Sequence, residues 1–359
     1  MMPAPSDVTH AWVNAIGTAV PERDIHQSFV DWARKRIDDP ARRALFARMV
    51  ARAGIRQRWS VLPDDPVADG GFYANAELPG TAARMRLYAE HAPALALRAI
   101  DQLGPLGSIS HLVVASCTGF VAPGLDQIIA RRLELDGSVE RTLVGFMGCY
   151  AAVAALRTAH HIVRSDPRAR VLVVSTELST LHLQAVSALE PLLAMLQFGD
   201  GAAAAIVSAE PSGLRLGPFF AATLPDSADL ITWVIGDTGF AMHLAGEVPG
   251  RIATALGDPA MRAAIGGDNG LSAIDGWAVH AGGRSILDAV AGALDLRADA
   301  LDDSRAVLDA YGNMSSATLL FVLARILARA ADHPVRDGRA IAFGPGLAAE
   351  GFRYASSTP

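Results

Sequence analysis

Lysine is almost missing from this sequence: Lys35 is the only one, so nearly all of the 31 cationic side chains are arginines. Charged residues as a whole are also few, at 19%, whereas apolar residues make up 51% of the 359 positions. This composition excludes intrinsic disorder. Because 37 acidic residues leave a net charge of −6, nucleic acid is not expected as a principal partner, and neither is an anionic membrane surface. The length predicts two to three domains or one duplicated domain.

Cysteine is nearly as rare, with Cys117 and Cys149 as the only two. Two cysteines cannot form a disulfide framework, and residues 1–5 do not begin a signal peptide, so we expect a cytoplasmic protein with free thiols. The longest uncharged stretch, 102–125, is broken by glycines and two prolines. It is therefore interpreted as a buried strand with loops, and no membrane span is predicted.

Positive charge is concentrated in one segment. A helix is predicted over 39–54, with Asp39 as its cap and Gly54 at its end. No acidic residue occurs between positions 40 and 58, but six arginines do: Arg42, Arg43, Arg48, Arg52, Arg56 and Arg58. Arg48 and Arg52 are four residues apart and share one face of the helix. The pattern predicts a local anion site on an acidic protein.

The rest of the chain alternates between strand and helix patterns, which indicates an α/β fold. After a surface loop over 62–80, a helix over 81–103 is expected to be interrupted at Pro93. The expected strands are 111–115, 171–175, 276–280, 306–308 and 340–343, and the expected helices are 150–163, 284–294 and 315–327.

The two halves of the sequence can be superimposed. Residues 148–156 and 312–320 each consist of a glycine, a polar residue and a helix of small and apolar residues. The spacing from Cys117 to Cys149 is 149 − 117 = 32, and that from His280 to Asn313 is 313 − 280 = 33. We infer an internal duplication with halves at 1–212 and 213–359, in which Cys149, His280 and Asn313 converge. The alternative is a coincidence of two ordinary buried helices that begin at glycines.

These three residue types suit thioester chemistry. A thiol in the first turn of a helix feels the positive end of the helix dipole, and a nearby imidazolium would also favour thiolate. Cys149 could accept an acyl group, while His280 and Asn313 could donate hydrogen bonds to an oxygen that becomes negative. Each also has an ordinary interpretation: a small buried hydrophobe, a core histidine and a helix cap.

Several segments resemble the type III polyketide synthases, that is, the chalcone and stilbene synthase family. They are VGFMGCYAA (144–152), FGDGAAA (198–204), WAVHAGGRSILD (277–288), YGNMSSA (311–317) and FGPGL (343–347). The matching positions follow one another in the same order as in the family, from about residue 48 to residue 350. It implies a thiolase-like fold of two duplicated α/β halves in five αβαβα layers, with Cys149, His280 and Asn313 as the catalytic triad.

The resemblance also implies roles around the triad. Phe198 matches an aromatic gatekeeper between the access tunnel and the cavity, and Met242 stands where plant members have a second Phe. Cys117 and His182 match cavity-lining positions, and Cys117 is typical of bacterial members. Arg48 and Arg52 match cations that bind the coenzyme A phosphates, although Leu45 replaces a third family lysine. The loop of Gly344, Pro345 and Gly346 would let backbone approach the intermediate closely.

The implied reaction is condensation of an acyl-CoA starter, here expected to be fatty, with malonyl-CoA, followed by cyclisation to a pyrone, a resorcinol or a related phenol. No metal site or cofactor is expected beyond these thioesters, because the histidines lack ligand spacing. The resemblance further implies a homodimer. Three alternatives are a ketoacyl-carrier-protein synthase III, a catalytically silent acyl-CoA-binding scaffold and, more distantly, a cysteine hydrolase.

Overall fold

The computed structural model describes residues 9–63, 65–74, 77–267 and 270–357. Its main feature is a nine-stranded sheet with the order β11-β12-β13-β8-β1-β7-β6-β4-β5. The strands of this sheet are β1 (Trp12–Ala19), β4 (His111–Ser116), β5 (Glu140–Gly145), β6 (Val171–Leu178), β7 (Asp200–Ser208), β8 (Leu214–Thr223), β11 (Gly276–Val279), β12 (Gly338–Gly344) and β13 (Ala348–Ser356). Strands β1 and β8 pair only through Trp12 with Arg215 and Val13 with Leu214, so the sheet consists of two parts with a short junction.

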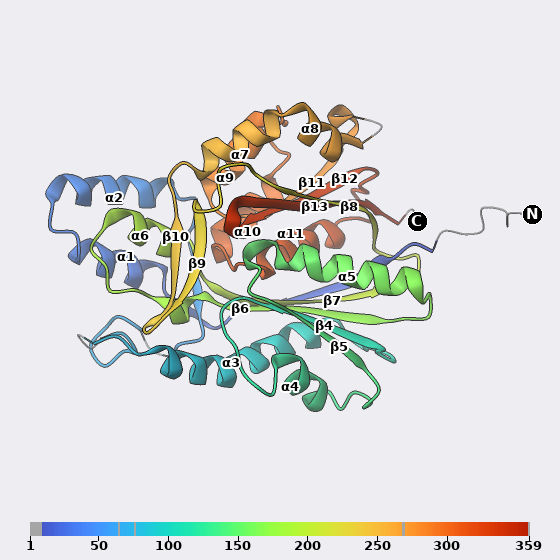
Figure 1. Ribbon diagram of the computed structural model, residues 1–359, viewed down its shortest axis with the longest axis horizontal. Coiled ribbons are helices and arrows are strands. Elements are labelled where there is room, and N and C mark those ends of the chain that lie inside the picture. Colours follow the sequence, from blue (N-terminus) through green and yellow to red (C-terminus); the bar gives the residue numbers. More distant parts are fainter. Residues whose placement is uncertain (1–8, 64, 75–76, 268–269, 358–359) are drawn as a thin grey trace, which may run out of the picture.

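Helices separate and cover these two parts in layers. The central helices α5 (Ala151–Ser165) and α11 (Ala317–Ala328) lie between the two groups of strands, and Figure 1 shows the sheets on either side of them. The outer face of the first group is covered by α3 (Thr81–Asp101) and α4 (Leu125–Arg132). The outer helices of the second group are α7 (Val248–Gly257), α8 (Pro259–Gly266), α9 (Arg284–Ala293) and α10 (Asp302–Tyr311). The predicted α/β fold with five αβαβα layers is thus confirmed.

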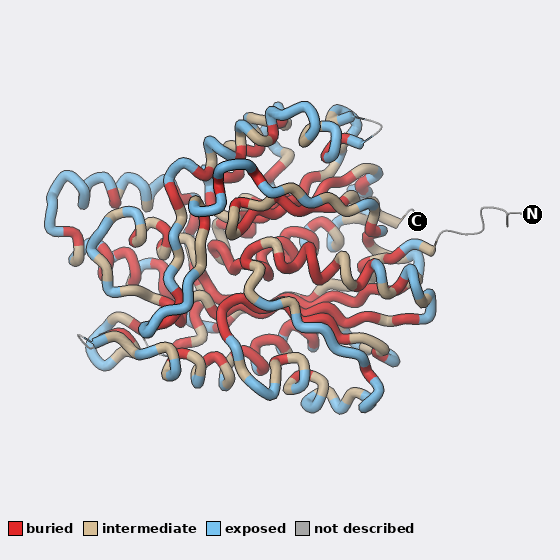
Figure 2. Tube along the Cα trace, viewed as in Figure 1, coloured by how far each residue is buried: buried red, intermediate tan, exposed pale blue. Residues whose placement is uncertain are grey.

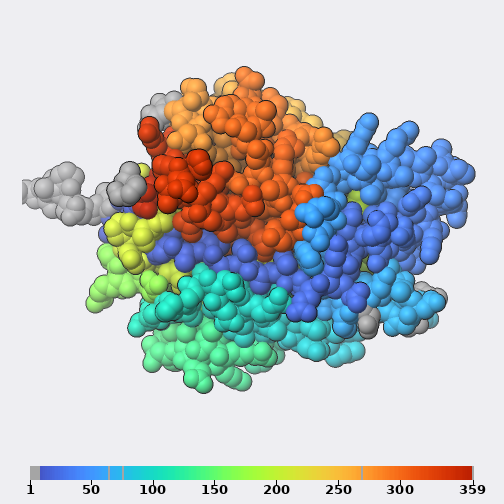
Figure 3. Space-filling model, turned by 180° about the vertical axis from the view of Figure 1, so that it is seen from behind, coloured from blue at the N-terminus to red at the C-terminus, as the bar shows by residue number. Residues whose placement is uncertain are grey.

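The remaining elements form one side of the molecule. They are α1 (His26–Lys35), α2 (Pro40–Arg52), α6 (Leu189–Met195) and the hairpin of β9 (Ile231–Gly236) and β10 (Gly239–Leu244), together with the short pair β2 (Arg23–Asp24) and β3 (Trp59–Ser60). The predicted helix over 39–54 is confirmed as α2, because Asp39 caps it by accepting a hydrogen bond from the backbone of Arg42 at 2.7 Å. Helix α2 lies at the periphery of the molecule (Figures 1 and 3).

The strand pairings repeat from one half to the other. Strand β7 runs antiparallel to β1 and to β6, and β6 is parallel to β4. In the second half β13 likewise runs antiparallel to β8 and to β12, and β12 is parallel to β11. The helices α5 and α11 follow equivalent positions and are largely buried, as Figure 2 shows. Equivalent turns of the two halves therefore face one central region.

The predicted strand over 306–308 is wrong. These residues belong to α10, where Asp303, Ser304, Val307 and Leu308 are buried. Positions 303, 304, 307 and 308 share one helical face, and two acidic residues in the first turn favour a helix start. A run of three apolar residues does not distinguish a strand from this pattern. The second half consequently has no strand corresponding to β5 at this place.

The expected interruption at Pro93 is also wrong. Helix α3 continues from Thr81 to Asp101 with Pro93 inside it. Proline removes one backbone hydrogen bond, but Tyr88, Ala92, Leu95 and Ala96 bury the face of this helix that packs on the first group of strands. Packing along the whole helix compensates for the missing bond. The other predicted strands and helices are confirmed to within a few residues.

No helix in the described ranges is both long and apolar enough to cross a membrane. Both cysteines are free thiols. Residues 1–5, on which the prediction of no signal peptide rests, lie outside the described residues.

Candidate active site

Cys149 lies in the short turn that leads into α5. A 3₁₀ turn spans Gly148–Tyr150, and α5 begins at the next residue. Gly148 has φ = +74°, and a Cβ atom there would come within 2.2 Å of the Cδ atom of Pro345. Glycine is required for both reasons. The turn holds the thiol at the N-terminal end of the central helix, where Cys149 is only 8% exposed.

His280 follows the last residue of β11 and is 1% exposed. Its backbone N–H donates to the carbonyl of Ile341 at 2.8 Å, which fixes the residue to β12. Within the described residues neither ring nitrogen has a hydrogen-bond partner. Buried polar atoms are normally satisfied. An imidazole with two free nitrogens is therefore poised for a bound molecule.

Asn313 connects the other two residues. Its amide nitrogen donates to the carbonyl of Gly282 at 3.2 Å, in the loop just after His280, and its side chain is near enough to Cys149 to lower the pKa of that thiol. The amide oxygen accepts from the backbone of Ser315 at 2.8 Å, so it also closes the local turn that precedes α11. The structure thus brings Asn313 to both Cys149 and the loop of His280.

Burial controls the protonation of the pair. It raises the pKa of the Cys149 thiol to about 12, although hydrogen bonds from Ser315 and Asn313 lower it. Burial also lowers the pKa of His280 to about 3. Burial thus opposes the expected thiolate–imidazolium pair in the free enzyme, because desolvation favours the uncharged form of both groups.

Cys117 and Glu177 form the layer behind the nucleophile. The sulfur of Cys117 accepts a hydrogen bond from the backbone N–H of Gly148 at 2.9 Å. Glu177, fully buried on β6, accepts hydrogen bonds from the backbone of Cys117 and from Thr118, both at 2.9 Å, and from the hydroxyl of Ser316. Burial raises the pKa of Glu177 to about 7, and its negative charge adds to the raised pKa of Cys149.

Both halves of the sequence match the profiles of one family. The N-terminal domain of chalcone and stilbene synthases matches residues 4–211, and the C-terminal domain matches residues 219–357. The chain belongs to the chalcone and stilbene synthase family. It is thus a type III polyketide synthase, an acyltransferase with a thiolase fold.

Individual relatives agree with this membership. The chain is 34% identical over 369 residues to the "alpha-pyrone synthesis polyketide synthase-like Pks18" of Mycobacterium tuberculosis, an alignment that covers 98% of this chain and 92% of that protein. Among solved structures, PKS-I from the brown alga Ectocarpus siliculosus is similar, with a TM-score of 0.87 and 29% identity over 98% of this chain and all of that one. The C-terminal type III polyketide synthase domain of Steely1, a type I/III hybrid from Dictyostelium, has a TM-score of 0.88 and 27% identity, covering 97% of this chain and 100% of that chain.

This polyketide synthase contains a mainly apolar cavity of about 230 Å³ beside the triad. Phe198, His182 and Met242 line it, as the resemblance implies, and so do Phe29 and Trp233. Phe198 also forms a backbone bridge with Asn313, so it lies between that residue and the cavity that it lines. Among the described residues that line this cavity Cys117 is not included, and its sulfur packs against the turn of Gly148.

The predicted loop of Gly344, Pro345 and Gly346 also lies outside that lining. Instead it packs on the turn of the nucleophile. A Cβ atom at Gly344 would come within 3.2 Å of the backbone nitrogen of Cys149, and Pro345 contacts Gly148. The loop therefore approaches Cys149 itself.

His182 is fixed in the neutral form. Its Nε2 lies 2.7 Å from the carbonyl of Thr118, and its Nδ1 accepts from the backbone of Phe240 at 3.0 Å. Its ring also stacks on that of Phe240, with the ring centres 4.2 Å apart. Because burial lowers the pKa of His182 to about 3, this histidine shapes the pocket and is not placed for acid–base chemistry.

The arginine segment divides into two groups. Arg42, Arg48 and Arg52 are exposed and form no ion pair with any described residue. The other three are used structurally. Arg43 donates to the carbonyl of Ile37, and Arg56 pairs with Asp309 at 3.1 Å; Arg58 is 1% exposed and donates to the carbonyl of Phe198 at 2.7 Å. Of the six arginines that predicted the anion site, only Arg42, Arg48 and Arg52 thus remain available to bind an anion.

Two contributors to the site were not identified from the sequence. Arg58 was counted as a surface cation, and only tertiary packing shows that it supports the carbonyl of the gatekeeper Phe198. Glu177 left a visible signal, since it is the one acid in the fully buried strand Val171–Leu178. No group of three or more His, Cys, Asp or Glu residues within the described ranges is arranged to hold a metal ion.

Proposed function

We propose that Cys149 carries the growing acyl chain, that His280 moves the proton, and that His280 and Asn313 stabilise the enolate formed from malonyl-CoA. The observation that carries this proposal is the buried imidazole of His280, whose two ring nitrogens have no partner among the described residues. Asn313 links the loop of His280 to the thiol of Cys149. The set provides one nucleophile and two polar groups for an oxygen.

The first step is acyl transfer from a starter thioester. His280 takes the proton of the Cys149 thiol as sulfur attacks the thioester carbonyl, and the bond from that carbon to the sulfur of coenzyme A then breaks. The departing sulfur receives the proton from His280. Because the thiol has a pKa of about 12 and the imidazole one of about 3, prior transfer to form an ion pair is unfavourable. Proton transfer is therefore coupled to attack.

The second step is decarboxylative condensation. The C–C bond to the carboxylate of malonyl-CoA breaks, carbon dioxide leaves, and the electron pair enters the enolate, whose oxygen accepts hydrogen bonds from His280 and Asn313. The enolate carbon attacks the acyl carbonyl on Cys149, the new C–C bond forms, and the bond from that carbonyl to the Cys149 sulfur breaks, which releases Cys149 as a thiolate that can accept the next acyl group. A dry, preorganised site strengthens these hydrogen bonds and protects the enolate from protonation by water.

A fatty acyl starter fits the cavity beside the triad. Its lining includes Phe29, Val186, Met195 and Met242, and it lies beyond Phe198. An alkyl tail buried there would gain about 0.8 kcal/mol per methylene. We propose an alkylpyrone or alkylresorcinol as product, and the printed name of the mycobacterial relative refers to alpha-pyrone synthesis.

The thioester substrates would dock on α2. The exposed arginines Arg42, Arg48 and Arg52 have no ion-pair partner among the described residues, and arginine suits phosphate through paired N–H donors. Arg48 and Arg52 would bind the phosphates of coenzyme A, while the thioester reaches Cys149.

We further propose a homodimer in the cytoplasm. Strand β5 is an edge strand with only β4 beside it, and its Leu143 is 46% exposed. Phe120 in the neighbouring loop is 43% exposed. An open apolar edge of this kind favours pairing with a second copy, and the two free thiols agree with a reducing compartment.

The test uses the purified protein with malonyl-CoA and a series of acyl-CoA starters of increasing chain length. We expect wild type to release alkylpyrone or alkylresorcinol masses, and Cys149→Ala to release none while remaining folded, because only a small buried volume is lost. Cys117→Ser, which keeps an acceptor for the backbone N–H of Gly148, is the matched control and should retain product formation. Polyketide made by Cys149→Ala would overturn the assignment of the nucleophile.

A further inference from the structure

A second cleft lies at the opposite end of α5 from Cys149. It has a volume of about 760 Å³, and its lining comes from the C-terminal end of α5, from β8 and from the region of β12 and β13. Its charged and aromatic residues are His10, Arg157, His160, His161, Arg164, Arg215, Phe219, Arg336, Asp337, Arg353 and Tyr354. The reaction proposed above uses none of them.

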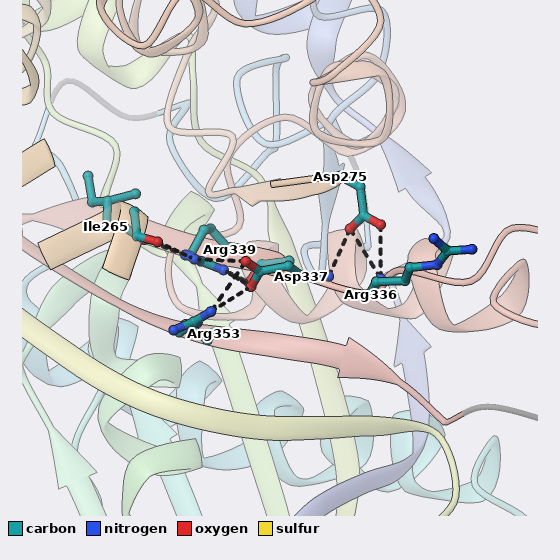
Figure 4. A network of polar contacts seen from close by, with 8 residues as sticks. Ile265, Asp275, Arg336, Asp337, Arg339 and Arg353 are labelled. Atoms are coloured by element: carbon teal, nitrogen blue, oxygen red, sulfur yellow. Dashed lines mark hydrogen bonds and ion pairs between the residues drawn. The ribbon is translucent and has the colours of Figure 1, made fainter. Parts of the chain in front are cut away.

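Its few acidic groups are already paired. Arg157 pairs with Glu350 at 2.7 Å. Asp337 forms ion pairs with both Arg339 and Arg353, as Figure 4 shows. Because both carboxylates are already paired with arginines, they do not neutralise the other cations in the cleft.

Three further arginines of the cleft form no ion pair with a described residue. They are Arg164, Arg215 and Arg336, and all three are exposed. The neighbouring carboxylate of Asp275 accepts hydrogen bonds from the backbone of Arg336 at 3.1 Å, and the guanidinium extends away from that carboxylate in Figure 4. On a protein with a net charge of −6, three free guanidinium groups around one concave surface are a local exception.

The wall of the cleft also contains an unsatisfied polar group. His160 is 7% exposed, and its Nδ1 atom has no partner among the described residues. Its ring lies 5.2 Å from the ring of Phe219 and 5.2 Å from that of His161. Burial, together with the charges of His161, Arg164 and His10, lowers the pKa of His160 to about 4 and favours the neutral imidazole. The rings of Phe219 and His161 are tilted by 55° and 67° to that of His160, so the wall presents separate aromatic faces beside the arginines.

We propose that this cleft binds a small polyphosphate anion through Arg164, Arg215 and Arg336. Paired N–H donors of arginine match phosphate oxygens, and several free cations in one site favour an anion with several charges over a single carboxylate. The ligand is either the polyphosphate of a nucleotide, whose base would stack on Phe219 or His161, or an inorganic polyphosphate. The site is independent of the proposed reaction.

Calorimetric titration with pyrophosphate, ADP and ATP tests the proposal. The starting protein carries Arg48→Glu and Arg52→Glu, so that the proposed coenzyme A site does not contribute. We expect saturable binding of pyrophosphate, ATP or both, with a Kd below about 1 mM. Tighter binding of ADP and ATP than of pyrophosphate would identify a nucleotide, and equal or tighter binding of pyrophosphate would identify the phosphate groups alone as the ligand.

Two further variants connect binding to the cleft. In the same background, Arg215→Gln with Arg336→Gln should weaken binding at least tenfold, whereas Arg131→Gln with Arg132→Gln, which removes two exposed arginines of α4, should not change it. Because Arg215 and Arg336 are exposed and form no ion pair with a described residue, their loss should not alter the melting temperature. Absence of saturable binding of all three anions, or unchanged affinity in the cleft variant, would refute the proposal.

Discussion

The side-chain amide of Asn313 donates a hydrogen bond to the carbonyl oxygen of Gly282, two residues beyond His280, across 3.2 Å. The same side chain lowers the pKa of the Cys149 thiol, and its oxygen accepts from the backbone of Ser315 in the turn before α11. The two halves of the amide thus have different tasks. The nitrogen donates a hydrogen bond on the side of the site, and the oxygen accepts a backbone hydrogen bond that supports the local turn.

This division predicts the effect of two substitutions at Asn313. Asn313→Ala should slow the decarboxylation of malonyl-CoA by about 100- to 1,000-fold, the usual cost of one lost donor to a developing oxyanion. Cys149 should still accept a starter, as measured by trapping a radiolabelled acyl group. Asn313→Asp keeps the acceptor for the backbone of Ser315 but loses the donor, so it should also lose decarboxylation. Normal decarboxylation by the Asp variant would mean that Asn313 only supports the turn before α11.

Glu177 should restrain the reactivity of Cys149. Its negative charge raises the pKa of the thiol, and Glu177 itself has a pKa of about 7, so the restraint is present above neutral pH and is lost below it. Glu177→Gln removes the charge and keeps the shape. We expect its iodoacetamide labelling of Cys149 to be several-fold faster than wild type at pH 8, with a rate profile displaced to lower pH. An unchanged profile would contradict this electrostatic role.

The thiols should also differ in reactivity. Burial raises the pKa of Cys117 well above its usual value, and its sulfur is occupied by the backbone of Gly148. Cys149 receives hydrogen bonds that favour thiolate. Peptide mapping after limited alkylation should therefore find label on Cys149 first, and prior labelling of Cys117 would reverse the assignment.

The arginines of α2 predict a substrate effect that depends on the nucleotide. Arg48→Glu with Arg52→Glu should raise KM for coenzyme A thioesters at least tenfold, which corresponds to about 1.4 kcal/mol. A short thioester without the nucleotide should be affected much less, and higher salt should weaken wild-type binding. Arg131→Glu with Arg132→Glu controls for net charge. Equal KM values for wild type and the α2 variant would end the proposal.

The cavity beyond Phe198 predicts control of chain length. Met242 lines it, so Met242→Trp should reduce kcat/KM for long acyl-CoA starters and leave short ones nearly unchanged. Val234→Trp, on the neighbouring strand of the same hairpin at a position 58% exposed, is the matched control. A uniform loss over all chain lengths would place the acyl tail elsewhere.

The sequence was sufficient to predict that Asn313 lies near Cys149 and the loop of His280, because these residues occur at equivalent points of a duplicated pattern. Residues 148–156 and 312–320 begin with glycines at φ = +74° and +68°, and the repeated turns do face one region. Protonation was not predictable, since it depends on burial of Cys149 and His280 by segments distant in sequence. The burial of Arg58 was not predictable either, because its sequence context is the same as that of the neighbouring exposed arginines. The helix over 306–308 was not predictable because a short run of apolar residues is compatible with a strand or a helix.

The position of the first strand has a consequence for synthesis on the ribosome. Strand β1 lies inside the sheet, between β7 and β8, although it is made before either of them. Its neighbours are residues 200–208 and 214–223. Trp12–Ala19 therefore cannot form its strand pairs until the ribosome has synthesised those residues. Contacts so distant in sequence slow folding. The junction between the two halves can therefore close only after residues 214 and 215, which pair with β1, have been made.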